Sequence, residues 1–247
     1  MYIRSVTLKE NAAELCEDYL FQIPAIEQLG ELEFTSPVTF FVGENGSGKS
    51  TLLEAIAVAY GFNPEGGSKN FHFSSAATHS SLYKALRIVK GPIRPRDGFF
   101  LRAESFYNVA TEVERLNDVS PVSLYDSYGG KSLHCQSHGE SFLSLILHRF
   151  WGKGLYLLDE PEAALSPARQ LSLLSRMGEL VREESQLVIA THSPILMAYP
   201  DAQIYVLGEN GITLTPYQET EHYFITKEFL QNPQRMLREL LSNGEDE

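Results

Sequence analysis

The sequence predicts an α/β protein in which a mixed β-sheet is flanked by helices. Two observations lead to this fold class. Short apolar segments with the length of buried strands alternate with longer segments of helical periodicity, and one buried strand runs into a helix through a glycine-rich loop at residues 38–51. We expect residues 1–247 to form a single domain. Within it, residues 61–136 should form a helical and loop insertion that includes a strand near 97–102, which returns to the main sheet.

Composition and charge narrow the class of protein. Hydrophobic residues make up 43% and charged residues 21% of the chain, and there is no run of 18 uncharged apolar residues, so we expect no membrane segment. The N-terminus lacks the apolar core of a signal peptide and the two cysteines provide no disulfide framework, which predicts a cytoplasmic protein. A net charge of −12 argues against a broad basic surface for nucleic acid, although nucleic acid stays open as a partner through a local patch.

The chain is expected to begin with strands at residues 2–8 and 31–42, separated by a polar stretch that contains Pro24. A helix over residues 49–60 should follow the glycine-rich loop. It should end at Gly61, because glycine readily adopts the left-handed conformation that terminates helices.

The expected insertion begins where the pattern changes. Glycine and serine pairs interrupt residues 61–98, so we expect short helices and loops there. A strand at residues 97–102, a helix at 104–116 and a turn-rich stretch at 117–136 follow. Five basic residues concentrate positive charge in this region, and we interpret them as part of a solvated loop: Arg87, Lys90, Arg94, Arg96 and Arg102.

Regular periodicity resumes at Ser137. The helix that starts there has an apolar face made of Phe142, Leu143, Ile146, Leu147 and Phe150. A second helix opens at Ser166-Pro167, and we assign its apolar side to Leu171, Leu174, Met177, Leu180 and Val181. The remaining expected elements are strands at residues 154–158 and 186–191, a hairpin at 203–208 and 212–215, and a helical C-terminal part from about residue 219 that is divided by Pro233.

The glycine-rich loop carries the clearest chemistry. Gly43, Gly48, Lys49 and Ser50 match the pattern G-x-x-x-x-G-K-[ST]. Glycines let backbone N–H groups approach phosphate oxygens, and the following helix directs its positive end at the same anion. Lys49 would reach the β and γ phosphates, and the Ser50 hydroxyl would hold Mg²⁺. We therefore expect a nucleoside triphosphate here, bound by Asn45, Gly46, Ser47, Gly48, Lys49, Ser50 and Thr51.

Two further strand ends carry polar residues suited to the same ligand. Asp159 and Glu160 end an apolar strand and point in different directions, so Asp159 can hold Mg²⁺ while Glu160 orients and deprotonates a water molecule. His192 lies within Thr191-His192-Ser193 at the end of another strand, where ligands gather in α/β sheets. It could contact the γ-phosphate, and it equally suits an ordinary polar strand cap.

Together these segments resemble the ATP-binding-cassette (ABC) class of P-loop ATPases over most of the chain. Four segments correspond in order to its Walker A motif, its Walker B motif with catalytic glutamate, its D-loop and its switch histidine: residues 43–51, 155–160, 164–166 and 191–193. The resemblance implies an ABC-type fold that uses ATP and Mg²⁺. It also implies that Glu160 and His192 are catalytic and that Ser50 and Asp159 are the metal ligands.

Ser137-His-Gly-Glu-Ser141 lies 22 residues before Asp159, at the place of the family's signature motif, LSGGQ. Only the serine and the central glycine match. Ser137 and Glu140 also form a capping box, and a helix N-terminus of this kind is a second anion site. In the resembling family, two molecules pair head to tail and each lays its signature across the other's ATP. The resemblance therefore implies an ATP-dependent homodimer in which Ser137 and Gly139 contact the nucleotide of the second copy.

The chain also departs from the family between Walker A and the signature. The family has a glutamine between Walker A and the signature, yet no glutamine occurs between Gln28 and Gln136. Glu104 and Asn108 are candidates to replace it. The chain is similar to compact stand-alone bacterial ATPases under the AAA label, which resemble the heads of SMC, RecF and OLD proteins, and an unidentified partner protein is expected. Two alternatives are the ATP-binding subunit of a transporter and a nucleotide-gated switch that restrains a toxin or nuclease.

Overall fold

A computed structural model describes residues 1–68, 80–103, 106–119, 125 and 128–242 of the chain. Within those residues the core is a seven-stranded sheet in the order β10-β9-β3-β8-β7-β6-β4. The five central strands run parallel, and the two edge strands pair antiparallel. The strands are β3 (Val38–Val42), β4 (Gly67–Ser68), β6 (Asp97–Arg102), β7 (Gly154–Asp159), β8 (Gln186–Ala190), β9 (Gln203–Gly208) and β10 (Gly211–Leu214).

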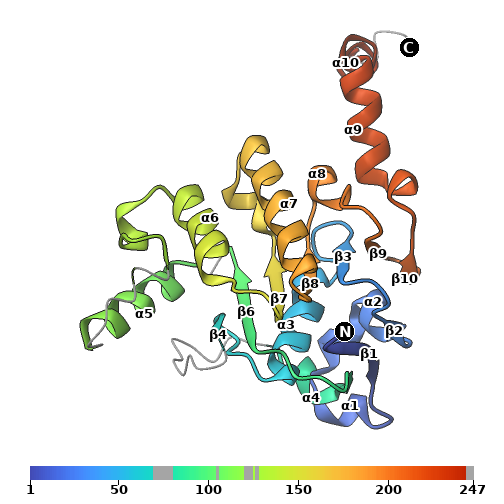
Figure 1. Cartoon of the computed structure of the whole chain (residues 1–247). Coiled ribbons are helices and arrows are strands. Elements are labelled where there is room, and N and C mark those ends of the chain that lie inside the picture. Colours follow the sequence, from blue (N-terminus) through green and yellow to red (C-terminus); the bar gives the residue numbers. More distant parts are fainter. Residues whose placement is uncertain (69–79, 104–105, 120–124, 126–127, 243–247) are drawn as a thin grey trace.

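Helices cover both faces of this sheet (Figure 1). Every residue of β3, β7 and β8 is buried, as expected for parallel strands covered on both sides. Successive side chains serve two cores: Phe41 shares one with α3 (Lys49–Tyr60), and Phe40 shares the other with helices α5 to α7. These helices are α5 (Phe106–Val119), α6 (His138–Arg149) and α7 (Pro167–Arg182). A mixed sheet flanked by helices confirms the predicted fold class.

A smaller antiparallel sheet packs on the α3 side. Its strands are β2 (Leu32–Glu33), β1 (Ile3–Leu8) and β5 (Leu86–Lys90), in that order. Short helices surround it: α1 (Ala12–Leu15), η1 (Asp18–Gln22, a 3₁₀ helix), α2 (Pro24–Glu27) and α4 (Leu82–Ala85). The buried side chain of Gln186, at the start of β8, accepts hydrogen bonds from the backbone N–H of Tyr2 (2.7 Å) and of Ile3 (2.8 Å). The Gln186 side chain therefore joins the two sheets by pairing with backbone groups at the start of β1, as a neighbouring strand would.

The structure corrects two predictions in the first half of the chain. The strand expected over residues 31–42 is two strands, β2 and β3, and the break falls at Pro37, which has no N–H to donate. Residues 61–98, where we expected short helices and loops, contain the short helix α4 but also a strand, β5, whose core-facing residues complete the small sheet. Part of that stretch, including Ser74 and Ser75, lies outside the described residues.

The solvated loop proposed for the basic residues is wrong for three of the five. Arg87 and Lys90 lie on β5, and the Lys90 ammonium is 4.4 Å from the centre of the Tyr60 ring. Arg102 is the last residue of β6, where its guanidinium forms an ion pair with Glu54. Arg94 and Arg96 are exposed in the loop between β5 and β6, as expected, so the positive charges are distributed over two sheets and this loop.

The second half follows the predicted order of elements, with errors of helix phase. The apolar side expected for α7 includes Leu171, which is 60% exposed, whereas Leu173 is fully buried. In α6, Leu147 is 40% exposed while Leu145 is fully buried. Both helices contain leucines at adjacent or alternate positions. Helical periodicity alone therefore does not decide which of these leucines face the core. Pro121, within the stretch that we expected to be turn-rich, lies outside the described residues.

The chain ends in two helices, α9 (Glu221–Gln231) and α10 (Pro233–Leu241), which extend away from the sheet in Figure 1. Neither has a buried residue, and several large apolar side chains are exposed, among them Phe224, Leu230, Leu240 and Leu241. Pro233 separates the two helices as predicted. Across the part of the chain that the structure describes, no helix combines the length and the apolar character needed to cross a membrane.

Candidate functional site

The glycine-rich loop lies between the end of β3 and the start of α3, and its shape depends on glycine at two positions. Gly43 has φ +149°, and a Cβ atom there would lie 2.3 Å from the carbonyl oxygen of Leu207 on β9. Gly48, the N-cap of α3, has φ +94°, and a Cβ atom there would lie 2.9 Å from Ile23. The loop is therefore pressed between β9 and the α2 region in a conformation that other residues rarely adopt.

Lys49 spans this loop from the first turn of α3. Its side chain is buried, and Nζ donates hydrogen bonds to the carbonyl oxygens of Gly43 (2.9 Å) and Glu44 (2.8 Å). Burial lowers the pKa of the ammonium, against the attraction of Glu160 and Asp159, which raises it. Lys49 thus places a partly desolvated positive charge at the loop, close to two carboxylates.

Ser50 and Asp159 meet next to Lys49. The Ser50 hydroxyl donates to Oδ1 of Asp159 at 2.8 Å, which brings the start of α3 to the end of β7. A hydroxyl and a carboxylate are oxygen ligands of the kind that Mg²⁺ prefers. The described residues contain no group of three or more His, Cys, Asp or Glu side chains that could hold a metal. A Mg²⁺ ion here would therefore complete its shell with phosphate and water oxygens, as Mg²⁺ usually does.

Glu160 follows Asp159 in an unusual backbone conformation. Its φ of 48° and ψ of 52° are left-handed, which costs a non-glycine residue about 1 kcal/mol or more. Its N–H donates to the carbonyl oxygen of Ala190 on β8 at 2.9 Å, which holds the turn against the next strand. The side chain is 40% exposed and lines an open depression. Such strain is typical of functional sites, where it orients one side chain.

His192 lies two residues after the end of β8 and faces Glu160, with 3.7 Å between its Nε2 and Oε1 of Glu160. The His192 N–H donates to Oε1 of Glu162 at 2.5 Å. The adjacent Ser193 donates through its hydroxyl to Oε1 of Gln170 at 2.6 Å. Burial is the main cause that lowers the pKa of His192, and burial also raises the pKa of Glu162. The backbone and neighbours of His192 thus hold it in place, and its lowered pKa favours the neutral form.

A second histidine reaches the site from α9. Nε2 of His222 lies 3.3 Å from Nδ1 of His192, and burial, followed by the charge of His192, lowers the pKa of His222. Both histidines line an open depression of ≈ 720 Å³, together with Glu44, Asn45, Glu160, Glu221, Ile225 and Thr226. A pocket of ≈ 540 Å³ extends from His222 along the loop residues Gly43 to Ser47 and the end of β9. The glycine loop therefore opens on cavities that are walled by the start of α9.

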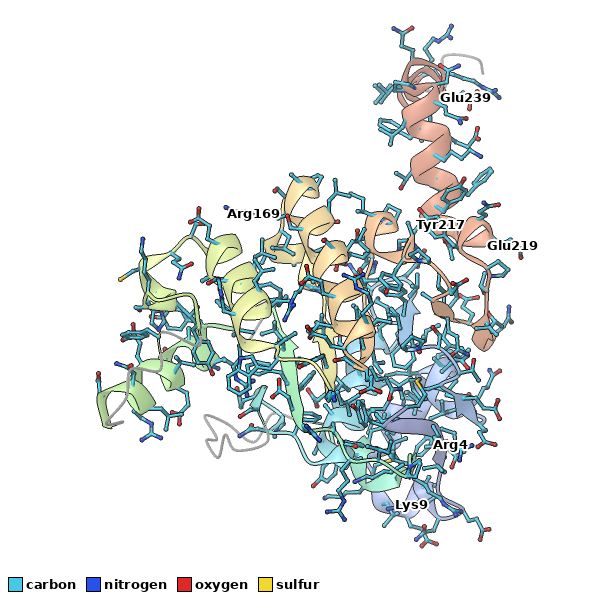
Figure 2. All side chains as sticks on the ribbon, viewed as in Figure 1. Arg4, Lys9, Arg169, Tyr217, Glu219 and Glu239 are labelled. Carbon is cyan, nitrogen blue, oxygen red and sulfur yellow. The ribbon has the colours of Figure 1, made fainter. Side chains whose placement is uncertain are left out.

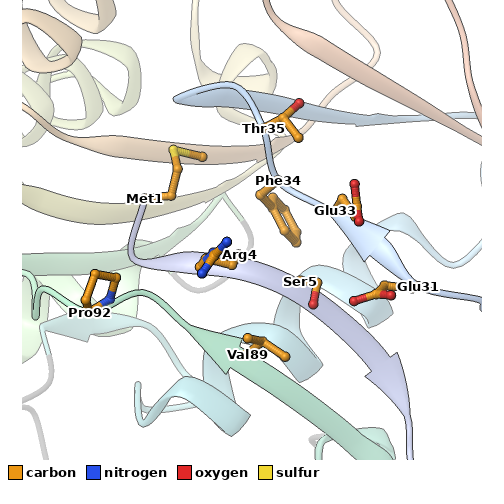
Figure 3. A pocket seen from close by; sticks show the side chains of 9 residues that line it. All are labelled: Met1, Arg4, Ser5, Glu31, Glu33, Phe34, Thr35, Val89 and Pro92. Atoms are coloured by element: carbon orange, nitrogen blue, oxygen red, sulfur yellow. The ribbon is translucent and has the colours of Figure 1, made fainter.

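Another depression, of ≈ 690 Å³, lies on the small sheet (Figure 3). Met1, Arg4, Glu31 and Phe34 are among the residues that line it, and none of the predicted site residues does. Its lining side chains form no catalytic arrangement that resembles the one around Lys49.

The N-terminus of α6 lies apart from the glycine loop. The predicted capping box is present, because Glu140 accepts from the backbone N–H of Ser137 (3.2 Å) and the Ser137 hydroxyl accepts from the backbone N–H of Glu140. The Ser137 hydroxyl also donates to the Glu140 carboxylate at 2.7 Å. A Cβ atom on Gly139 would lie 2.3 Å from the carbonyl oxygen of Ala164, so glycine permits close packing on η4 (Pro161–Ala164). Arg169 on α7, labelled in Figure 2, pairs with Glu140 at 3.2 Å. Figure 1 shows α6 and β3 well separated, and α6 packs on α7 and η4. The N-terminus of α6 therefore belongs to a different part of the molecule from the glycine loop that follows β3.

Comparisons with known proteins agree with this geometry. A family profile described as "AAA domain" matches residues 23–100, and another described as "AAA domain, putative AbiEii toxin, Type IV TA system" matches residues 140–198. The cobalt import ATP-binding protein CbiO of Salmonella typhimurium is 25% identical over 193 residues, covering 72% of this chain and 69% of the relative. The cytochrome c biogenesis ATP-binding export protein CcmA of Mesorhizobium japonicum is 29% identical over 179 residues, covering 67% of this chain and 83% of the relative.

The chain is similar to P-loop ATPases of the ABC type. Its fold agrees with that of cbiO1 from Clostridium perfringens, part of the ABC transporter complex cbiONQ, with a TM-score of 0.51 and 16% identity over 97% of this chain and 98% of the other. A putative metal-chelate type ABC transporter in an inward-facing conformation gives the same TM-score and identity over 92% and 88%. The recognised motifs of this ATPase thus lie on the expected fold.

The structure also places the remaining predicted residues of this ATPase. Asn45, Gly46 and Ser47 line the ≈ 540 Å³ pocket, and Thr51 is half-buried in the first turn of α3. Asn108, a candidate for the missing glutamine, instead donates to Glu65 at 3.2 Å. Glu104, the other candidate, lies outside the described residues.

Three residues near the site were not predicted from the sequence. Arg102 ends β6 beside Asp159, with its Nε 3.6 Å from Oδ2. Glu162 holds the backbone of His192, and His222 contacts its ring. In the sequence, Arg102 is one of several clustered basic residues, and Glu162 and His222 belong to no motif. Only the contacts between distant segments of the structure place these three residues at the site.

Proposed function

We propose that this ATPase hydrolyses Mg·ATP within a head-to-tail pair of its own copies and passes the closing and opening of that pair to a partner protein. The observation that carries the proposal is the contact between Ser50 and Asp159, with Glu160 and His192 at the adjacent strand ends. A cytoplasmic location, expected from the sequence, is part of this proposal.

Each of these residues has a role in phosphoryl transfer to water. Lys49 and the loop N–H groups bind the β and γ phosphates, and Ser50 and Asp159 would hold Mg²⁺, which neutralises charge on the phosphates when bound. Glu160 orients a water molecule and accepts its proton as the water oxygen bonds to the γ-phosphorus. The bond from the γ-phosphorus to the bridging oxygen breaks at the same time, which leaves ADP and inorganic phosphate. His192 donates a hydrogen bond to the γ-phosphate.

A second copy would complete the site. The N-terminus of α6 presents backbone N–H groups and small residues suited to an anion, yet it lies apart from the glycine loop of its own chain. In a head-to-tail pair, Ser137 and Gly139 of each copy would face the γ-phosphate bound by Lys49 of the other. Because two such sites would enclose two nucleotides, pairing would depend on ATP.

Two other functions draw on specific observations. The cobalt import and cytochrome c biogenesis relatives favour a transporter subunit, although β6 ends in Arg102 and the sequence lacks a glutamine near this point. Copurification with a membrane protein would support that function. The profile that mentions a toxin favours a nucleotide-gated switch, for which ATP-dependent binding of a toxin or nuclease without repeated turnover would be the sign.

Replacement of Glu160 by glutamine tests the proposal, because the amide keeps the shape and cannot accept the proton. We expect Glu160→Gln to lower turnover about 100-fold or more while ATP binding persists, so ATP-bound dimers accumulate in light-scattering measurements. Glu228→Gln, an exposed carboxylate on α9, is the matched control and should change neither quantity. Normal hydrolysis by Glu160→Gln would remove Glu160 from its role, and a monomer at saturating ATP would contradict the pairing.

A further inference from the structure

The start of α9 is fastened to the segment that carries His192. Tyr217, labelled at the base of the C-terminal helices in Figure 2, donates through its hydroxyl to the carbonyl oxygen of Pro194 at 2.8 Å, two residues after His192. Thr220 is 1% exposed, and its hydroxyl donates to the carbonyl oxygen of Tyr217 at 2.7 Å and caps α9. His222 therefore projects from a helix turn that is fixed relative to His192.

The contact between the two histidines leaves one proton to be assigned. Nδ1 of His192 lies 3.3 Å from Nε2 of His222. In a pair of neutral imidazoles one nitrogen must donate and the other accept. Nε2 of His192 is buried, makes no hydrogen bond within the part of the chain that the structure describes, and lies 3.7 Å from the carboxylate of Glu160. The state of the His192 ring is thus fixed by what His222 does.

The surroundings favour one of the two arrangements. If His192 donated from Nδ1, its Nε2 would direct a lone pair at the carboxylate of Glu160 and at the phosphate oxygens of bound ATP. The lone pair and these anionic oxygens would repel each other. If His222 donates, the proton of His192 lies on Nε2 and points at those oxygens. Burial lowers the pKa of both rings and so favours their neutral forms, and the positive charge of Lys49 lowers the pKa of His192 further, against the opposing effect of Glu160.

We propose that His222 is a positioning residue for His192: its Nε2–H donates to Nδ1 of His192 and holds the His192 proton on Nε2, facing Glu160 and the γ-phosphate. The inference rests on the proposed function for its effect on turnover, whereas the tautomer itself exists without turnover. Because His222 belongs to the first turn of α9, it also links the projecting C-terminal helices to the nucleotide site.

Nitrogen-15 NMR of the histidine rings in the wild-type protein tests the tautomer directly. We expect the His192 ring to be neutral with its proton on Nε2, and we expect His222→Phe, which keeps the bulk but cannot donate, to mix or reverse the tautomers. A wild-type His192 with its proton on Nδ1 would overturn the proposal, whether or not any variant folds. This measurement needs no ATP, so it can fail or succeed independently of the Glu160→Gln experiment.

Turnover tests the consequence. We expect His222→Phe to lower kcat about 10-fold or more with little change in the KM for ATP, and His222→Gln, whose amide can donate, to stay within about 3-fold of wild type. The pair His192→Ala and His222→Phe should be no slower than His192→Ala alone, because both changes remove one interaction. Glu228→Ala on the exposed side of α9 is the control. Full activity in His222→Phe, or multiplicative losses in the double variant, would overturn the role of His222.

Discussion

Gln186 allows a prediction whose magnitude follows from the structure. Its buried side chain accepts from the N–H groups of Tyr2 (2.7 Å) and Ile3 (2.8 Å) and donates to the carbonyl oxygen of Ile3 (3.0 Å). Gln186→Leu would leave three buried backbone groups without partners, at about 1–2 kcal/mol each, or about 3–6 kcal/mol of unfolding free energy in total. With a urea dependence of about 3 kcal/mol per molar, the unfolding midpoint should fall by about 1–2 M.

Gln203 provides a matched control. It makes the same three kinds of hydrogen bond, from Thr35 (2.7 Å) and Ser36 (3.0 Å) and to Glu33 (3.3 Å), but at a more exposed position at the start of β9. Water can replace the lost partners there, so Gln203→Leu should cost only about 1 kcal/mol. Urea unfolding followed by circular dichroism compares the two variants. Equal losses would refute the argument that burial of the unpaired groups sets the cost.

Two further predictions concern the site. Since the fold lowers the pKa of His192 and His222, the unfolded chain takes up protons below about pH 6.5 that the native state resists, so stability should be present above that pH and fall as pH drops through it. Replacing both histidines by asparagine should flatten the urea-measured fall between about pH 7 and 5, and an unchanged slope would contradict the assignment. Gly139→Ala should destabilise the protein by about 1–3 kcal/mol in the same assay, because the new Cβ would lie 2.3 Å from the Ala164 carbonyl oxygen. Gly208→Ala, where no atom lies within 4 Å of the new Cβ, should be close to neutral, and equal effects would count against the packing argument.

The parts of this fold that could be predicted are those that local sequence determines. The limits of α3 follow from the glycine loop before Lys49 and from Gly61, which adopts the left-handed conformation with φ 110°. The hairpin of β9 and β10 follows from the turn residues between the two strands. The capping box follows from the three-residue spacing between Ser137 and Glu140. In each case a few adjacent residues suffice.

The parts that could not be predicted depend on contacts between distant segments. Gln186 joins β1 across 184 positions in sequence, and its side chain offers no pattern that names Tyr2 as its partner. Arg102 and His222 reach the site only because the strand order brings β6 beside β7 and because α9 packs near the end of β8. Sequence periodicity specifies neither the strand order that places Arg102 nor the packing of α9 that places His222.

The composite site is the central claim, and mixing two inactive variants tests it most directly. Lys49→Ala removes nucleotide binding from one copy, and Ser137→Arg blocks the α6 N-terminus of the other. In a head-to-tail pair of the two, the Ser137→Arg copy supplies an intact Lys49 and the Lys49→Ala copy supplies an intact Ser137, so one site works. With random pairing, about half of the dimers carry one of two sites, and an equimolar mixture should recover about a quarter of wild-type ATPase activity. No recovery from variants that still associate, or full activity of Ser137→Arg alone, would contradict the account.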